Sequence, residues 1–103
     1  MDEMSKLAYL LAKNDIPFQL VGQTFPDFDG DPKKGIYNLK AYVQIVSPSE
    51  EDWKIDAIWH PGSYGYKEGL LEIMGHSTEE YEDGVVGHLT AEEALEYFRR
   101  AVS

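Results

Sequence analysis

The sequence predicts a single α+β domain covering residues 1–103, with an antiparallel sheet of about 4–5 strands and with N-terminal and C-terminal helices packed on one face. Apolar residues recur at helical spacing near both ends of the chain. Through the middle of the chain they alternate with polar residues, as in half-buried strands. The six-residue link between the two clearest strands is too short for the crossover that parallel strands require, so we expect a hairpin there.

The first helix is expected from about Asp2 to Asn14. Its apolar residues include Met4, Leu7 and Leu11, whose spacing places them on one face. The helix should end before Pro17, because proline disfavours the helical conformation in the residue that precedes it.

Three strands are expected in the next part of the chain. Phe18–Val21 is a short one, and residues 22–35, rich in Pro, Gly and Asp, should form a long loop after it. Asn38–Val46 and Trp53–Trp59 alternate apolar and polar residues, and they should pair across the polar turn at residues 47–52. The residues predicted to share one face of the second of these strands are Trp53, Ile55, Ala57 and Trp59.

The remaining chain adds two strands and a helix. The pattern of Glu68–Met74 fits either a strand or a helical turn, and we favour a strand closed by Gly75. Val85–His88 is expected to form a shorter final strand. Between them, Ser77–Glu80 has the spacing of a capping box and predicts one helical turn. A clearer capping box at Thr90–Glu93 opens the C-terminal helix. The apolar stripe of that helix consists of Ala94, Leu95, Phe98, Ala101 and Val102.

Composition and charge exclude several classes of function. Cysteine is absent, which removes disulfides, thiolate zinc sites and cysteine nucleophiles. Acidic residues outnumber basic ones by 19 to 9, and the net charge of −10 repels the phosphate backbone of nucleic acids, so no direct nucleic-acid binding is expected. No apolar run is long enough for a transmembrane helix, and the acidic start of the chain is unlike a signal peptide. We therefore expect a cytoplasmic protein that does not bind membranes.

The sequence contains the residue types of a hydrolase triad, but their spacing does not fit one. Ser63, His60 and Asp56 supply a nucleophile, a base and an acid. A nucleophile elbow needs Gly-x-Ser-x-Gly between a parallel strand and a helix, whereas here Gly62-Ser63-Tyr64-Gly65 lies between expected antiparallel strands. We therefore predict no catalytic residue and no enzymatic activity.

Metal and cofactor sites are not predicted either. His60, His76 and His88 are separated by spacings that fit no standard zinc pattern. The acidic loop at residues 27–31 resembles a calcium loop, but Pro32 stands where the sharp turn of such a loop needs glycine. We expect no cofactor, and an irregular cation site in this loop is left open as an alternative.

Two features favour a binding surface. The turn Gly62–Tyr66 is rich in glycine and tyrosine and follows Trp59, and exposed aromatic side chains often anchor interfaces. Between Lys67 and Arg99 the chain has nine carboxylates and no lysine or arginine, and acids on the solvent side of the last helix would steer basic partners. The predicted partner-binding residues are Trp59, Tyr64, Tyr66, Glu79, Glu80, Glu82, Asp83, Glu92, Glu93 and Glu96.

A resemblance to known proteins extends over about half of the chain. The stretch Asp56–Gly75, which contains Trp-His-Pro-Gly-Ser-Tyr-Gly-Tyr, and the stretch Gly87–Glu93 resemble small uncharacterised acidic proteins of bacterial prophages and mobile elements. That group has no established activity, so the resemblance implies no catalytic residue. It implies a setting, in which small acidic accessory proteins bind and block a host protein, including nucleic-acid-guided defence enzymes.

Together these observations predict a non-enzymatic protein-interaction domain. Its expected partner is a basic host protein, such as a nucleic-acid-binding or nuclease defence protein, which it would inhibit by mimicking nucleic acid in the manner of an anti-CRISPR protein. Two alternatives stay open. One is a small-ligand or cation-binding module that uses residues 27–31 and the aromatic turn. The other is a structural domain that forms a homodimer or larger oligomer through an exposed strand edge.

Overall fold

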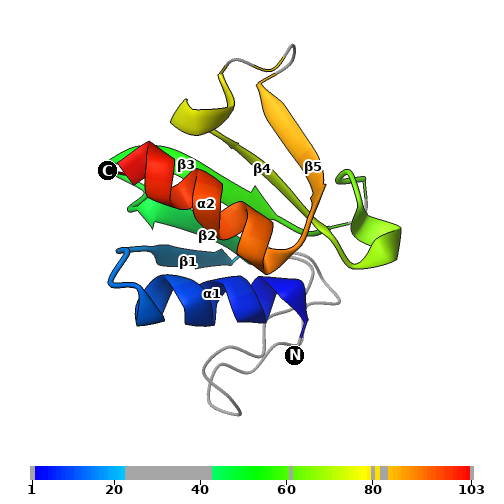
Figure 1. Ribbon diagram of the computed structural model, residues 1–103, viewed down its shortest axis with the longest axis horizontal. Coiled ribbons are helices and arrows are strands. Elements are labelled where there is room, and N and C mark those ends of the chain that lie inside the picture. Colours follow the sequence, from blue (N-terminus) through cyan, green and yellow to red (C-terminus); the bar gives the residue numbers. More distant parts are fainter. Residues whose placement is uncertain (1, 23–42, 61, 80, 82–83, 103) are drawn as a thin grey trace.

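The structure is a computed structural model, and it describes residues 2–22, 43–60, 62–79, 81 and 84–102. In these residues five strands form one antiparallel sheet in the order β1-β2-β3-β4-β5, accompanied by two α-helices (Figure 1). This confirms the predicted α+β fold. The elements are α1 (Glu3–Lys13), β1 (Gln19–Gly22), β2 (Val43–Pro48), β3 (Trp53–Ile58), β4 (Leu71–Gly75), β5 (Val85–Leu89) and α2 (Ala91–Val102), with 3₁₀ turns at Tyr66–Glu68 and His76–Thr78.

Helix α1 begins and ends at local signals. The Asp2 carboxylate accepts a hydrogen bond from the N–H of Ser5 at 2.7 Å, which satisfies a backbone donor that the first turn leaves unpaired. After the last turn, the N–H of Ile16 donates to the carbonyl of Leu11 at 2.9 Å, and Asp15 has a φ of 57°. This is a Schellman motif, and because Leu11 and Ile16 are both buried in the core, it also directs the chain toward β1.

Helix α2 begins at the predicted capping box. The N–H of Thr90 donates to the Glu93 carboxylate at 3.0 Å, and the N–H of Glu93 donates to the Thr90 hydroxyl at 3.3 Å. A second carboxylate, that of Glu3 in α1, also caps the N-terminus of α2, since it accepts a hydrogen bond from the N–H of Ala91 at 2.7 Å. Negative charge is favourable at a helix N-terminus, so this contact helps to hold the two helices together.

The hydrophobic core lies between the helices and the inner face of the sheet. One row of side chains crosses all five strands on this face: Leu20, Ile45, Ala57, Ile73 and Val86. The three central members of the row are fully buried and belong to the same cluster as the apolar residues of α1 and α2. Helix α2 crosses the middle of the sheet, and α1 packs beside it near β1 (Figure 1).

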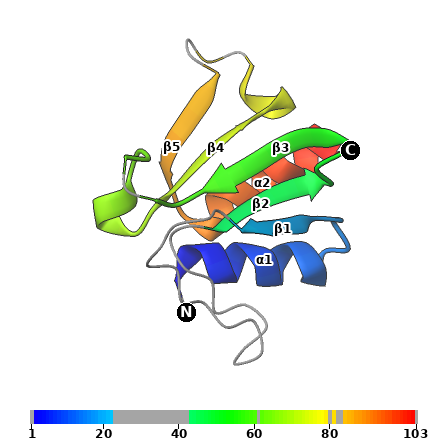
Figure 2. The same cartoon turned by 180° about the vertical axis from the view of Figure 1, so that it is seen from behind.

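The opposite side of the sheet, here called the outer face, is not crossed by either helix. Figure 2 shows it from behind, with the strands in front of α2. Alternation places on it the row Gln19–Val46–Asp56–Met74–Val85, which again crosses all five strands, and two further pairs, Val21 with Gln44 and Ile58 with Glu72. None of the helices in the described residues has the length and apolarity that a membrane crossing requires.

Five predictions on local structure need correction or fall outside the described residues. Trp53 does not share a face with Ile55, because the register shifts at Pro48 and turns the Trp53 indole toward Asp56 on the outer face. Strand β4 begins at Leu71, since residues 66–68 form a 3₁₀ turn instead. The turn predicted at Ser77–Glu80 begins one residue earlier. The expected loop at residues 23–35 and the start of the strand at residues 38–42 lie outside the described residues.

Candidate functional site

A carboxylate lies at the centre of the outer face. Asp56 belongs to β3, the middle strand of the five, and only 9% of it is exposed. Its Oδ2 atom accepts hydrogen bonds from the Gln44 side-chain amide at 2.9 Å and from the Trp53 indole N–H at 3.1 Å. Both donors come from β2 and β3 themselves, so the hairpin positions this group without help from any loop.

Burial changes the acidity of this group. Removal from water raises the pKa of the Asp56 carboxyl above its ordinary value, because the charged form loses hydration. The hydrogen bonds from Trp53 and Gln44 oppose the rise, and the negative charge of Glu72 adds to it. The folded protein therefore holds a proton on Asp56 to a higher pH than the unfolded chain does.

Asp56→Asn is expected to stabilise the fold at neutral pH. Because the pKa of Asp56 is raised in the folded state, its favourable contribution is complete below the unfolded value of about 3.9 and is lost as the pH rises through the folded value. Asparagine has no such titration and keeps an oxygen for the same two donors. The melting temperature of the variant should exceed that of the wild type at pH 7, and the difference should shrink as the pH falls to about 4.

The control for this prediction is Asp52→Asn, which removes the same charge from an exposed position in the turn between β2 and β3. Its effect on the melting temperature should be small at every pH. A gain at Asp56→Asn that does not change with pH, or a loss of stability at pH 7, would contradict the prediction.

Large apolar side chains surround Asp56 on the outer face. Trp53 is 38% exposed and Met74, the β4 partner of Asp56, is 45% exposed. The Trp53 ring meets His76 edge to face, with ring centroids 5.8 Å apart. The face thus combines a buried carboxylate with an exposed aromatic ring and an exposed thioether.

The aromatic turn adjoins this face. Tyr64 is 55% exposed, and its backbone N–H donates to the Glu72 carboxylate of β4 at 3.2 Å. Tyr64 also lies against Gly87 of β5 so closely that any side chain at position 87 would overlap it. Ser63 stabilises the turn, since its hydroxyl donates to the carbonyl of His60 at 2.8 Å. Tyr64 is therefore held in an exposed position at the edge of the outer face.

The other two aromatic residues predicted to bind a partner are less accessible. Trp59 packs against the core, and its indole N–H donates to the carbonyl of Tyr66 at 3.0 Å. The two rings lie with centroids 5.4 Å apart. Trp59 and Tyr66 thus brace the turn that presents Tyr64. Beside this turn, a shallow pocket of about 270 Å³ is lined by Tyr64, Tyr66 and His88, among other residues.

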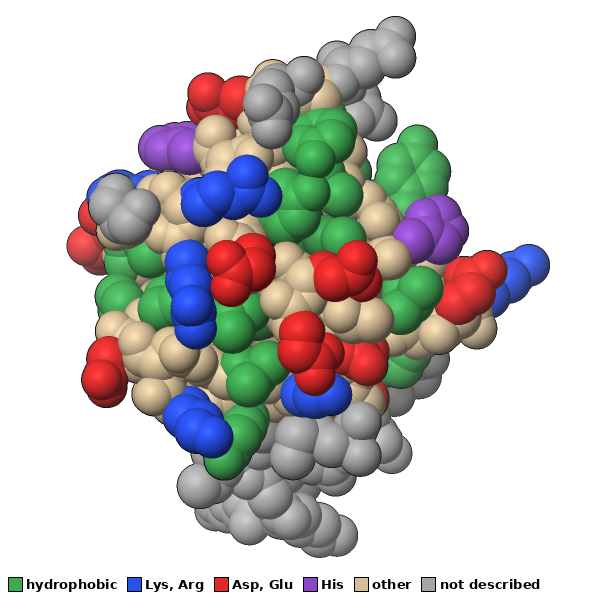
Figure 3. Space-filling model, viewed as in Figure 1, with side chains coloured by type: hydrophobic (Ala, Val, Ile, Leu, Met, Phe, Trp, Pro, Cys, Tyr) green, Lys and Arg blue, Asp and Glu red, His purple; other side chains and the backbone are tan. Residues whose placement is uncertain are grey.

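The acidic residues of α2 are exposed but balanced by basic neighbours. Glu92 forms an ion pair with Lys6 of α1, and Glu96 lies 3.6 Å from Arg99. The hydrogen bond and charge of Lys6 lower the pKa of Glu92. Glu93 belongs to the capping box. Figure 3 shows the result on this side of the molecule, where acidic side chains gather toward the start of α2 and basic ones toward its end.

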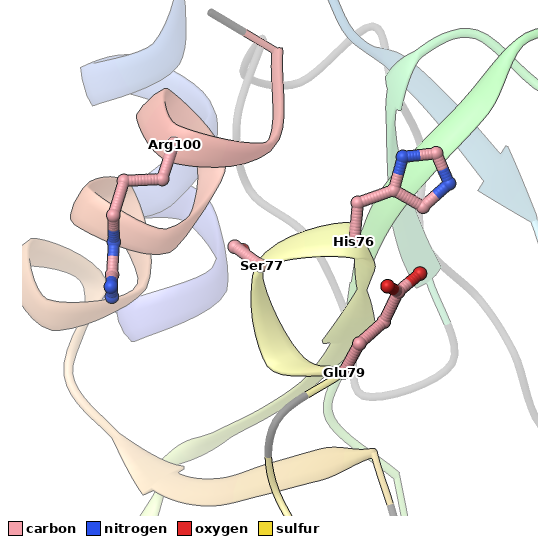
Figure 4. A pocket seen from close by; sticks show the side chains of 4 residues that line it. All are labelled: His76, Ser77, Glu79 and Arg100. Carbon is pink, nitrogen blue, oxygen red and sulfur yellow. The ribbon is translucent and has the colours of Figure 1, made fainter.

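A larger shallow pocket, of about 370 Å³, lies between the turn after β4 and the end of α2. His76, Ser77, Glu79 and Arg100 line it, and Figure 4 shows that Arg100 lies on one side while His76 and Glu79 point to the other. The Ser77 hydroxyl is engaged with the carbonyl of Tyr97 at 2.7 Å. These side chains do not converge on a common point.

The described residues include only some of the predicted site. Glu80, Glu82 and Asp83, like the acidic loop at residues 27–31, lie outside the described residues. Within the described part, no group of three or more His, Asp or Glu side chains is placed to hold a metal ion. The structure brings Tyr64 to the outer face, but it places Glu92, Glu93 and Glu96 with α2, on the other side of the sheet.

Sequence reasoning did not select Asp56, Trp53, Gln44 or Met74 as binding residues. The available signal was an aspartate inside a β-strand, because carboxylates are disfavoured there and are retained for a reason when they are buried. Comparisons with known proteins found no match: no family model fits the chain, and no curated protein or solved structure is significantly similar to it.

Proposed function

We propose that the protein is a non-enzymatic interaction domain that binds a basic host protein and blocks it. The observation that carries this proposal is the outer face, a sheet surface that neither α1 nor α2 covers and that presents Trp53, Met74 and Tyr64 beside carboxylates. Monomeric proteins seldom leave such apolar groups together on one surface unless it is a contact surface. Aromatic anchors within a polar surround are typical of protein interfaces.

The charge of the molecule supports a basic partner. The net charge of −10 attracts positively charged proteins over distances of about 10 Å and accelerates their association. Glu92 and Glu96 have side chains that are 56% and 63% exposed, and their ion pairs with Lys6 and Arg99 are surface pairs of low strength. These carboxylates can therefore exchange their own cations for those of a partner.

The kind of partner follows from the same chemistry. Proteins that bind nucleic acids carry basic surfaces that recognise rows of phosphates. An acidic protein that occupies such a surface competes with the nucleic acid. The resemblance of Asp56–Gly75 and Gly87–Glu93 to acidic proteins of prophages and mobile elements supports the setting of an accessory inhibitor directed at a nuclease-type defence protein.

Charge reversal on α2 tests this function. Association of the protein with purified basic nucleases, including nucleic-acid-guided ones, would be measured at low and high salt together with nuclease activity. We expect salt-sensitive binding and inhibition of at least one of them. The double variant Glu92→Lys/Glu96→Lys should slow association about tenfold or more, because steering charges act mainly on the association rate.

The matched control is Glu50→Lys/Glu51→Lys, which changes the net charge by the same amount in the exposed segment that leads into β3. It should slow association less. If no nuclease of the panel binds in a salt-sensitive manner, or if binding leaves nuclease activity unchanged, the proposed function is wrong. Equal slowing by the two double variants would contradict the role given to α2.

A further inference from the structure

Asp56 occupies a central strand position between apolar neighbours on the outer face. Its partners across the outer face are Val46 on β2 and Met74 on β4, both apolar. A central strand position of this kind favours β-branched or aromatic residues, and a partly desolvated carboxylate is unfavourable unless something compensates it. Within the described residues, the compensation consists of two neutral donors, Gln44 and Trp53, which both reach Oδ2.

The charged residues of the sheet leave this region negative. The five strands contain Lys54, Asp56 and Glu72 and no other charged residue. Glu72 is near enough to act electrostatically on Asp56. Two carboxylates thus stand against one ammonium group, and an exposed indole ring lies directly beside the buried carboxylate. This combination is complementary to a cation that can also stack on a ring.

We propose that the outer face docks an arginine side chain of a basic protein partner, with its guanidinium paired to Asp56 and stacked on Trp53. Arginine fits better than lysine, because the guanidinium is planar, weakly hydrated and able to stack on an aromatic ring while it donates hydrogen bonds to a carboxylate. This inference rests on the proposed function and names the side chain by which the partner is held. Met74 and Tyr64 would flank the bound segment.

A second copy of the chain is a poorer occupant of the same face. In a symmetric dimer the same patch meets itself, so Asp56 and Glu72 of one copy would approach the same residues of the other. Like charges that are desolvated together are strongly unfavourable. The charge of the face therefore favours a basic partner.

The two indole groups of the chain provide an internal comparison for the test. The ¹⁵N-labelled full chain would be titrated with a short oligo-arginine peptide and, separately, with an oligo-lysine peptide of the same length, while the indole N–H signals are followed by NMR. We expect the Trp53 signal to shift and saturate, because its N–H is bonded to Asp56. The Trp59 signal should stay in place, because its N–H is bonded to the carbonyl of Tyr66. The arginine peptide should bind about tenfold more tightly than the lysine peptide.

Asp56→Asn should weaken the arginine peptide about tenfold or more, and Asp52→Asn should change its affinity little although it removes the same charge. Because Asp56→Asn is expected to be the more stable protein at neutral pH, unfolding cannot account for such a loss. Three outcomes would overturn the inference. The peptide-induced shifts could be confined to α2, or the two variants could bind the peptide with equal affinity. The Trp53 signal could also shift with protein concentration in the absence of peptide.

These outcomes are separable from those that test the proposed function. Binding of the peptide only at α2 would contradict the arginine site at Asp56 but would remain consistent with a basic partner. Failure of every nuclease in the panel to bind would remove the function, whereas the Trp53 signal would report on the site independently.

Discussion

Gly75→Ala is expected to destabilise the protein by about 3 kcal/mol, because the methyl group would have to occupy space already filled by β3. A Cβ atom at this position would lie 2.5 Å from the Cα and 2.7 Å from the Cβ of Ile55, and it would also overlap the carbonyl oxygen of Lys54. These are backbone or near-backbone atoms that cannot rotate away. The two strands must move apart, and the Ile55–Gly75 pair is the neighbour of the Asp56–Met74 pair on the outer face.

Urea unfolding followed by tryptophan fluorescence would measure the loss for Gly75→Ala. Gly22→Ala serves as the control, since a Cβ atom there meets no atom of the described residues within 4 Å and the residue is likewise part of a strand. It should be neutral or slightly stabilising, because alanine reduces the conformational freedom of the unfolded chain. If the two variants were equally stable, the close approach of β3 to Gly75 would not exist in solution.

Local signals accounted for most of the fold. Asp2, Pro17 and the Thr90–Glu93 box mark helix ends, and each acts through hydrogen bonds or steric limits within a few residues, so that the sequence contains the whole cause. The same holds for the alternation of Ile55 and Ala57, which places both in the core. Elements of this kind can be predicted because their physics is local.

The position of Trp53 could not be predicted in the same way. Alternation along β3 assigns it to the side of Ile55, but the register shift at Pro48 depends on how β2 pairs with β3. The indole then turns to the outer face and bonds to Asp56. A bulge is a property of two paired strands, so a pattern read along a single strand does not reveal it.

Of the outer-face residues in the candidate site, only Tyr64 at its edge was predicted from the sequence to bind a partner. The glycine-rich turn was predicted to contribute aromatic binding residues, and of these Tyr64 is exposed at 55%. The centre of the outer face depends on which side of the sheet the helices cover and on which residues meet across strands. Asp56 is buried by those neighbours, although its residue type predicts exposure.

Phe98→Ala is expected to have the largest effect on stability, a loss of about 3–5 kcal/mol. Phe98 lies on α2 and is the largest of the fully buried side chains among the described residues. Its truncation removes apolar area from the core and leaves a cavity between α2 and the sheet, which the surrounding strands can fill only in part. Thermal and urea unfolding would measure the loss. Glu96→Ala, two positions earlier on the exposed side of α2, should change stability by less than about 1 kcal/mol.

The same variant separates the role of the core from that of the outer face. Phe98 packs against the inner face, so the sheet stands between it and Asp56. At a temperature where Phe98→Ala is still folded, it should bind the arginine peptide with wild-type affinity, because no group that contacts the guanidinium has changed. If Phe98→Ala lost peptide affinity in proportion to its loss of stability, the β2–β3 hairpin alone would not be enough to preorganise the outer face. Unchanged peptide affinity together with a large loss of stability would show that the core residues and the binding residues lie on opposite faces of one sheet.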